Sequence, residues 1–179
     1  MKWTPSLLAS VMCVGGASMP IVAHAKIYMS VEQAQKAIFG NVAMENKPVV
    51  ISAQVQEMMR DASSVSHPFA SNRIWKTGKG DWLIVDEVVG KHEMITYAIG
   101  INADGSIKQI DVLEYRESYG AEVAEPSWKD QFIGKTAAST LKLNKDIKNV
   151  SGATLSAKHM TDGVKRVMVM YDQVLKNLH

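Results

Sequence analysis

The sequence has almost no cysteine. Its 179 residues contain one, Cys13, which lies within the first 25 residues. Those residues resemble a signal peptide, with a basic start, an apolar run over 7–16, and Ala23-His24-Ala25 as a cleavage site. We therefore expect residues 1–25 to be removed and residues 26–179 to form one domain without cysteine. Such a domain has no disulfide, thiolate metal site, iron–sulfur cluster or cysteine-linked haem.

Strong net charge and long apolar runs are also lacking after residue 25. The whole chain has 20 Lys plus Arg and 18 Asp plus Glu, a net charge of +2; without Lys2, the only charged residue of 1–25, 19 basic and 18 acidic residues remain, and the two signs are interleaved. This balance provides no basic surface for nucleic acid. No later stretch reaches the ~20 apolar residues that span a bilayer. We therefore expect a periplasmic protein that is either free or docked at the inner membrane. The histidines show no ligand spacing, so no metal site is expected.

The pattern predicts an α+β fold, with helices packed on an antiparallel β-meander that forms a half-barrel-like sheet. Four runs read as strands, over residues 73–77, 82–89, 94–101 and 106–116. Asp104-Gly105 marks a hairpin, and a slip in apolar parity predicts a bulge at Lys108-Gln109. No Gly-x-Gly-x-x-Gly follows a strand, which excludes a Rossmann phosphate cradle.

Three helices are expected around this meander. The first has a capping box of Ser30 and Gln33, ends near Gly40, and has an apolar face of Val31, Ala34, Ala37 and Ile38. The second covers residues 52–63, with four residues directed inward, Val55, Met58, Met59 and Ala62. A short third helix is expected over residues 125–132.

The last element is a long C-terminal helix with one apolar stripe. The stripe advances by four or three residues through Met160, Val164, Val167, Tyr171, Val174 and Leu178. The opposite side is charged, and Asp162 with Arg166 and Asp172 with Lys176 have the spacing of helical ion pairs. We therefore expect Arg166 to face solvent.

A segment rich in hydroxyl groups, Ser151 to Ser156, directly precedes this helix. Gly152 permits close backbone approach, and Thr154 presents a hydroxyl where free N–H groups and the helix dipole favour a phosphate. The residues alone leave two interpretations open. Either Thr154 carries an esterified phosphate, or Thr154 or Ser151 is only an N-cap. Lys158, one turn later, either faces that phosphate or is a solvated lysine.

Ser151-Gly152-Ala153-Thr154-Leu155-Ser156 resembles the flavinylation motif of the FMN-binding domain family. That family includes the C subunit of the sodium-translocating NADH:quinone reductase and the G subunit of the Rnf complex. Glu117-Ser118-Tyr119-Gly120 resembles the family's Glu-Thr-Pro-Gly segment, and residues 125–135 resemble the stretch that follows it. Two positions differ from the family. Lys148 stands where an Asp is usual, with Asp146 nearby as a substitute, and Tyr119 replaces the Pro.

The resemblance implies covalent FMN, joined to Thr154 by a phosphoester. A separate flavin transferase would attach it, with FAD as donor and Mg²⁺. The resemblance also implies that the rest of the motif lines the phosphate and ribityl chain, namely Ser151, Gly152, Ala153, Leu155 and Ser156. The flavin ring would lie near Glu117, Ser118, Tyr119 and Gly120. Glu117 then accepts a hydrogen bond from the flavin or pairs with a nearby base, and Tyr119 stacks on the ring or alters the turn.

The implied function is periplasmic electron transfer with a redox partner protein, for which a membrane complex and a cytochrome are both candidates. The chain is then an electron carrier or a subunit of a redox system rather than a complete enzyme, and no catalytic residue is assigned. Two alternatives remain. One is a flavin-dependent reductase of a small acceptor. The other is a non-redox binding module whose flavin site has decayed, as Lys148 and Tyr119 would suggest.

Overall fold

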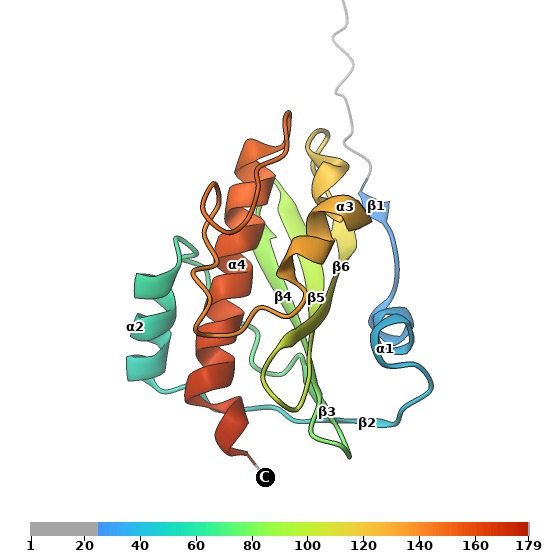
Figure 1. Cartoon of the computed structure of the whole chain (residues 1–179), viewed down its shortest axis with the longest axis vertical. Helices are drawn as coiled ribbons and strands as arrows, with labels where there is room; N and C mark the ends of the chain where they lie inside the picture. The colour runs from blue at the N-terminus through green and yellow to red at the C-terminus, as the bar shows by residue number, and fades with distance from the viewer. Residues whose placement is uncertain (1–24, 179) are drawn as a thin grey trace, which may run out of the picture.

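A single antiparallel sheet of six strands forms the centre of the molecule (Figure 1). The computed structural model describes residues 25–178, so the expected signal peptide over 1–25 lies outside the described residues, apart from Ala25. The spatial order is β1-β6-β5-β4-β3-β2, and each neighbouring pair is antiparallel. The strands are β1 (Lys26–Ile27), β2 (Met44–Asn46), β3 (Ile74–Thr77), β4 (Trp82–Val89), β5 (Met94–Ile101) and β6 (Ile107–Tyr115).

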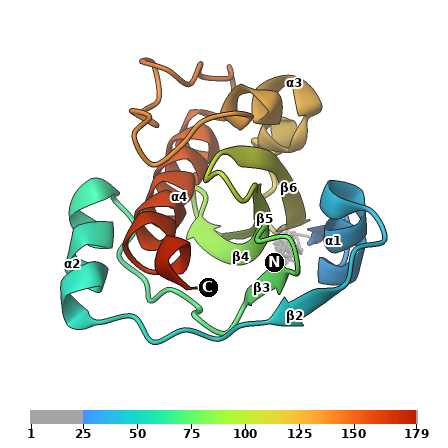
Figure 2. The same ribbon diagram turned by 60° about the horizontal axis from the view of Figure 1, so that its bottom comes forward.

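The predicted meander is confirmed. Two bulges in β6 account for the curvature of the sheet. Gly100 pairs with Gln109 while Ile101 pairs with Ile107, so Lys108 is the extra residue of the predicted bulge. A second bulge, which was not predicted, leaves Leu113 outside the pairing. Bulges increase local twist and bend a strand, and the sheet curls into a half-barrel (Figure 2). The short edge strands β1 and β2 were not predicted, because two or three residues show no apolar alternation.

Helices cover both faces of the sheet. The long helix α4 (Thr154–Gln173) lies in the concave side, with α2 (Ala53–Ala62) beside it, while α1 (Val31–Phe39) lies on the convex side (Figures 1 and 2). Three further turns are 3-10 helices, η1 (Ala121–Ala124), η2 (Asp130–Phe132) and η3 (Leu175–Asn177), and α3 (Pro126–Lys129) is a single α-helical turn. None of the helices within residues 25–178 is long and apolar enough to cross a membrane.

The predicted helix signals are mostly confirmed. Ser30 and Gln33 form the reciprocal capping box of α1, and Gly40 caps its other end. Ser52 caps α2, whose C-cap is Ser63. Two residues expected to face inward, Ala37 and Met58, are instead exposed.

Two apolar clusters lie on opposite faces of the sheet. The larger fills the concave side, where alternate residues of β4 and β5 such as Ile84, Val88 and Ile99 pack against Val164 and Val167 of α4. The smaller joins Leu83, Val85, Ala98 and Leu113 to Ala34 and Ile38 of α1. Strands covered on both faces lose the polar alternation of a half-exposed strand, which is why β4 is apolar over most of its length.

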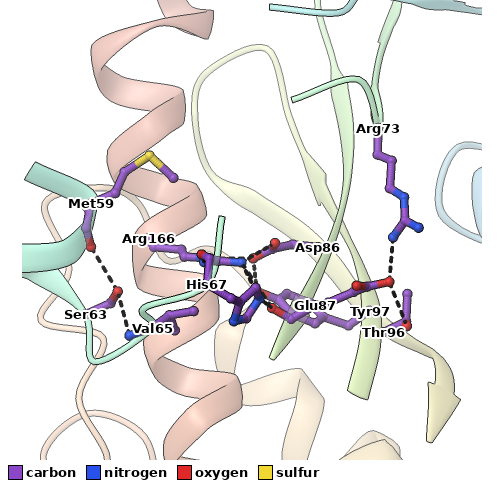
Figure 3. A network of polar contacts seen from close by, with 10 residues as sticks. All are labelled: Met59, Ser63, Val65, His67, Arg73, Asp86, Glu87, Thr96, Tyr97 and Arg166. Atoms are coloured by element: carbon purple, nitrogen blue, oxygen red, sulfur yellow. Dashed lines mark hydrogen bonds and ion pairs between the residues drawn. The ribbon is translucent and has the colours of Figure 1, made fainter. Parts of the chain in front are cut away.

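Arg166 does not face solvent, contrary to the sequence-based prediction. Its side chain is only 2% exposed and pairs with Asp86 of β4, with Nε 2.8 Å from Oδ2. Its remaining donors reach the carbonyl oxygens of His67, at 3.0 Å, and Glu87, at 3.1 Å (Figure 3). The hydroxyl of Tyr97 donates to the same carboxylate at 2.7 Å, and burial and that carboxylate raise the pKa of Tyr97 well above its usual value. Asp162, the expected partner of Arg166, pairs with Lys158 instead.

This buried pair gives a stability prediction. Asp86→Ala leaves the Arg166 guanidinium buried without its carboxylate, which should reduce the free energy of unfolding by about 3–5 kcal/mol. The matched control is Asp172→Ala, which breaks the exposed pair with Lys176 and should cost less than about 1 kcal/mol. Urea unfolding of the two variants measures both values. Equal losses would contradict the assignment of Arg166 as a buried anchor.

Candidate functional site

The first turn of α4 offers three backbone N–H groups to a ligand. The first bond within the helix runs from Ala157 N to Ala153 O at 2.8 Å, so the N–H groups of residues 154–156 have no acceptor inside the helix. No side chain caps this end, and Ala153 stands at the N-cap position. The interpretation of Thr154 or Ser151 as the N-cap is therefore wrong. Thr154 is the first helical residue and is exposed.

The motif turn depends on Gly152. Its φ of 85° lies in the left-handed region that favours glycine. The N–H of Ala153 then donates to the carbonyl of Val150 at 3.2 Å, which closes the turn into α4. Gly152 therefore shapes the turn that leads into Thr154.

Gly120, from the segment after β6, lies directly against the motif. Its φ is 91°, and a Cβ atom placed on it would lie 2.7 Å from Tyr115 Oη, 2.9 Å from Ser156 Oγ and 3.4 Å from Ala153 Cβ. Only glycine fits at this contact. The structure thus brings Gly120, Ala153 and Ser156 together, although more than 30 residues of chain separate Gly120 from the other two.

Tyr115, a residue that the sequence analysis missed, links the two segments by hydrogen bonds. Its hydroxyl lies 2.5 Å from the carbonyl oxygen of Tyr119 and 3.0 Å from Ser156 Oγ. Burial raises the pKa of Tyr115, so the hydroxyl keeps its proton. Since the carbonyl of Tyr119 can only accept, Tyr115 donates to it and accepts from the hydroxyl of Ser156. The side chain of Ser156 is therefore buried, and only its backbone N–H belongs to the open helix end.

Glu117 holds the turn between β4 and β5. Its Oε1 accepts from the backbone N–H of Glu93 at 2.9 Å and from that of His92. Burial of the carboxyl raises its pKa, but these backbone donors more than offset that effect, and the net pKa is lowered. Successive N–H groups form a nest for an anion, which Glu117 fills. The alternative in which Glu117 pairs with a nearby base is wrong.

His159 holds the same turn from the side of α4. Its Nδ1 lies 2.7 Å from the carbonyl oxygens of both Val89 and Gly90. Carbonyl oxygens only accept, so Nδ1 carries the proton. The β4–β5 turn is thus tied to α4 by His159 and to the Glu117-Ser118-Tyr119-Gly120 segment by Glu117, which makes it a third element of the site.

Two large apolar side chains of the segments that build the site, Tyr119 and Leu155, are exposed. Tyr119 is 85% exposed and Leu155 is 44% exposed. Ser118 and Ser151 are also exposed. Large apolar side chains left in solvent beside an open helix end are available to pack on a flat ring.

The residues before the motif do not place a carboxylate at Thr154. Asp146 accepts from the backbone N–H groups of Leu141, at 3.0 Å, and Lys142, at 2.8 Å, and forms an ion pair with Lys135. It therefore organises its own loop. Lys148 is exposed. The side chain that does contact Thr154 is Asn149, whose Nδ2 lies 3.0 Å from Thr154 Oγ1.

Lys158 is directed toward Ser64, in the loop after α2, rather than toward the helix start. Its Nζ lies 2.9 Å from both Asp162 Oδ2 and Ser64 Oγ. It is engaged in these contacts, so it does not supply a charge at Thr154. Among residues 25–178, no cluster of three or more His, Cys, Asp or Glu side chains could hold a metal ion.

Comparisons with known proteins match the part of the chain that builds this site. Residues 90–169 match the FMN-binding domain family. The G subunit of the Na(+)-translocating ferredoxin:NAD(+) oxidoreductase complex of Acetobacterium woodii is 33% identical over 86 residues, which cover 43% of this chain. The aligned part spans 42% of that relative's length. The C subunit of the Na(+)-translocating NADH-quinone reductase of Parabacteroides distasonis has a similar fold, with a TM-score of 0.51, 16% identity and 83% of each chain covered.

The contact at Gly120 can be tested with a matched pair of glycines. Gly120→Ala inserts a methyl group against Tyr115 and Ser156, whereas Gly134 has a similar φ of 77° and open space around it. Gly134→Ala should cost about 1–2 kcal/mol for the left-handed backbone alone. Gly120→Ala should cost a further ~1–3 kcal/mol for overpacking. Urea unfolding measures both, and equal costs would contradict the close contact between the two segments.

The lowered pKa of Glu117 predicts a dependence of stability on pH. Its pKa in the folded protein lies below the ordinary value of 4.5. The carboxylate therefore stabilises the fold above the unfolded pKa, and this contribution is lost as the pH falls through the folded pKa. Glu117→Gln should be less stable than the wild type at pH 7, and the difference should shrink below pH ~4.5. A difference that is constant in unfolding free energy between pH 7 and pH 3 would refute this role.

Proposed function

Residues 90–169 belong to the FMN-binding domain family, and on that premise we propose that this chain is a periplasmic electron-transfer protein carrying FMN as a phosphoester on Thr154. The single observation that carries the attachment is the start of α4. Thr154 is its first residue, is exposed, and lies within the part of the chain that matches the family.

The residues at the helix start fit the phosphate of such a cofactor. The N–H groups of residues 154–156 are free of acceptors within the helix, and no side chain caps them. Phosphates bind at such ends because the N–H groups and the helix dipole both favour negative charge. Gly152 opens the approach, while Ala153 and Gly120 are packed behind it. An esterified phosphate would take the place that a capping side chain occupies in other helices.

The apolar surroundings of Thr154 fit the ring. Leu155 follows Thr154 directly and Tyr119 lies in the segment packed on the motif; both are exposed, and a flavin ring that packed on them would cover apolar surface that solvent now reaches. FMN supplies one-electron and two-electron chemistry when it is bound. The residues of this chain position the cofactor and set its electrostatic surroundings. The segments around the site are joined by hydrogen bonds from the side chains of Tyr115, Glu117 and His159.

The localisation and the partner are parts of the same proposal. Export rests on the signal-peptide pattern of residues 1–25. The relative from Acetobacterium woodii is named as a subunit of an oxidoreductase complex, and this supports a redox protein as the partner of this chain. We propose that the chain exchanges electrons with another redox centre rather than with a small molecule.

Intact mass tests the attachment. Protein produced in a host with a flavin transferase should weigh one FMN more, less one water, than the unmodified chain. Thr154→Ala should abolish the adduct, because it removes the hydroxyl that forms the ester. Ser151→Ala is the control and should keep the adduct, since its exposed hydroxyl is not the attachment point. An unmodified wild type, or an adduct that persists in Thr154→Ala, would overturn the proposal.

A further inference from the structure

Asn149 is the only residue among 25–178 whose side chain lies within hydrogen-bond distance of the Thr154 hydroxyl. Its Nδ2 lies 3.0 Å from Thr154 Oγ1, and its Oδ1 accepts from the backbone N–H of Val150 at 2.8 Å. The second bond determines how the amide is turned. Because the oxygen is engaged with a backbone donor, the NH₂ group is the part that faces Thr154.

The position of Asn149 is fixed by the residue before it. Both backbone groups of Lys148 are held: its carbonyl accepts from Trp128 Nε1 at 2.9 Å, and its N–H donates to Gln131 Oε1 at 2.7 Å. Trp128 is itself buried and packs edge-on against Phe132, with ring centroids 5.2 Å apart. The chain therefore enters the motif from a rigid support, although Asn149 and Thr154 are both exposed.

We infer that Asn149 is a positioning residue for the flavinylation of Thr154, acting through the hydrogen bond that its amide donates to the Thr154 hydroxyl. The inference rests on the proposed function. The amide N–H occupies one lone pair of Thr154 Oγ1 and holds the side chain in one orientation. A hydrogen bond donated to an oxygen also favours its ionised form, so the same contact stabilises the negative charge that develops on Oγ1 during attack.

The step itself is a group transfer without any change of oxidation state. Thr154 Oγ1 forms a bond to the phosphorus on the riboflavin side of FAD, and the phosphoanhydride bond breaks. AMP leaves with the electron pair of that bond. The hydroxyl proton passes to a base of the transferase. Asn149 takes no proton in this scheme, because an amide is neither an acid nor a base near neutral pH, and it acts only through its donated hydrogen bond.

The test is a time course of flavinylation with the purified unmodified chain, a flavin transferase, FAD and Mg²⁺, followed by intact mass. Asn149→Ala should react about tenfold more slowly or worse, as expected when a hydrogen bond to a developing charge is lost. Lys148→Ala, which removes a neighbouring exposed side chain, should react within about twofold of the wild type. The loss in Asn149→Ala should appear in kcat rather than in KM for the chain.

A second variant separates the donated hydrogen bond from a structural effect. Asn149→Asp keeps the size and the acceptor for Val150 N–H but cannot donate to Thr154, so it should be as slow as Asn149→Ala. Unchanged urea midpoints in both variants would confirm that folding is intact. An Asn149→Ala or Asn149→Asp chain that reacts as fast as the wild type overturns this inference alone. A wild type that stays unmodified overturns the proposed function instead.

Discussion

The buried pair between Arg166 and Asp86 determines how α4 is placed along the sheet, and the position of the site follows from it. Thr154 precedes Arg166 by 12 residues, about 18 Å of helix at 1.5 Å per residue. From Asp86 to the end of β4 at Val89 is only about 10 Å. The first turn of α4 therefore extends past the end of β4. There the loops between strands can reach it, and its free N–H groups are not covered by the sheet.

Three loops contact the part of α4 that extends past the end of β4, or the segment that leads into it. The β4–β5 turn is bonded to α4 through His159, and Glu117 ties that turn to the segment after β6. The segment after β6 is packed on the motif through Gly120 and Tyr115. The loop before α4 is supported by Trp128 and Gln131. Most of these ties join a backbone group of one segment to a side chain of another, so the relative positions of the loops are set by few residues.

Much of the fold could be predicted from the sequence, because the patterns were local. The bounds of β4 and β5 were predicted correctly from β-branched runs between turns, and Ser30 with Gln33 marked the start of α1. Arg166 was placed wrongly because helical spacing and charge both indicate solvent when no partner is known. The sequence did contain a signal for the partner of Arg166. Asp86 lies two residues from both Ile84 and Val88, so all three share one face of a strand. A carboxylate on such an apolar face is buried and needs a cation.

The site was predicted only through resemblance. Local physics left Thr154 with two interpretations, and the contact between Gly120 and Ser156 spans a distance in sequence that no periodicity reveals. The role of Glu117 could not be derived, since its partners are backbone N–H groups, which every residue other than proline carries. The hydrogen bond from Asn149 to Thr154 could not be predicted from the sequence either, because it depends on the conformation of the Val150 to Ala153 turn.

The identity of the first residue of α4 also bears on how freely a tethered group can move. Threonine is β-branched, and in a helix its χ1 angle is confined to two rotamers. The Cα of Thr154 is held by the helix, and its oxygen is held by Asn149. Anything joined to that oxygen leaves the surface within a narrow range of directions. The protein backbone would thus set the direction in which an ester at Thr154 begins, while the bonds beyond the oxygen would still rotate, so the loops around the helix start would have to hold the rest of the attached group.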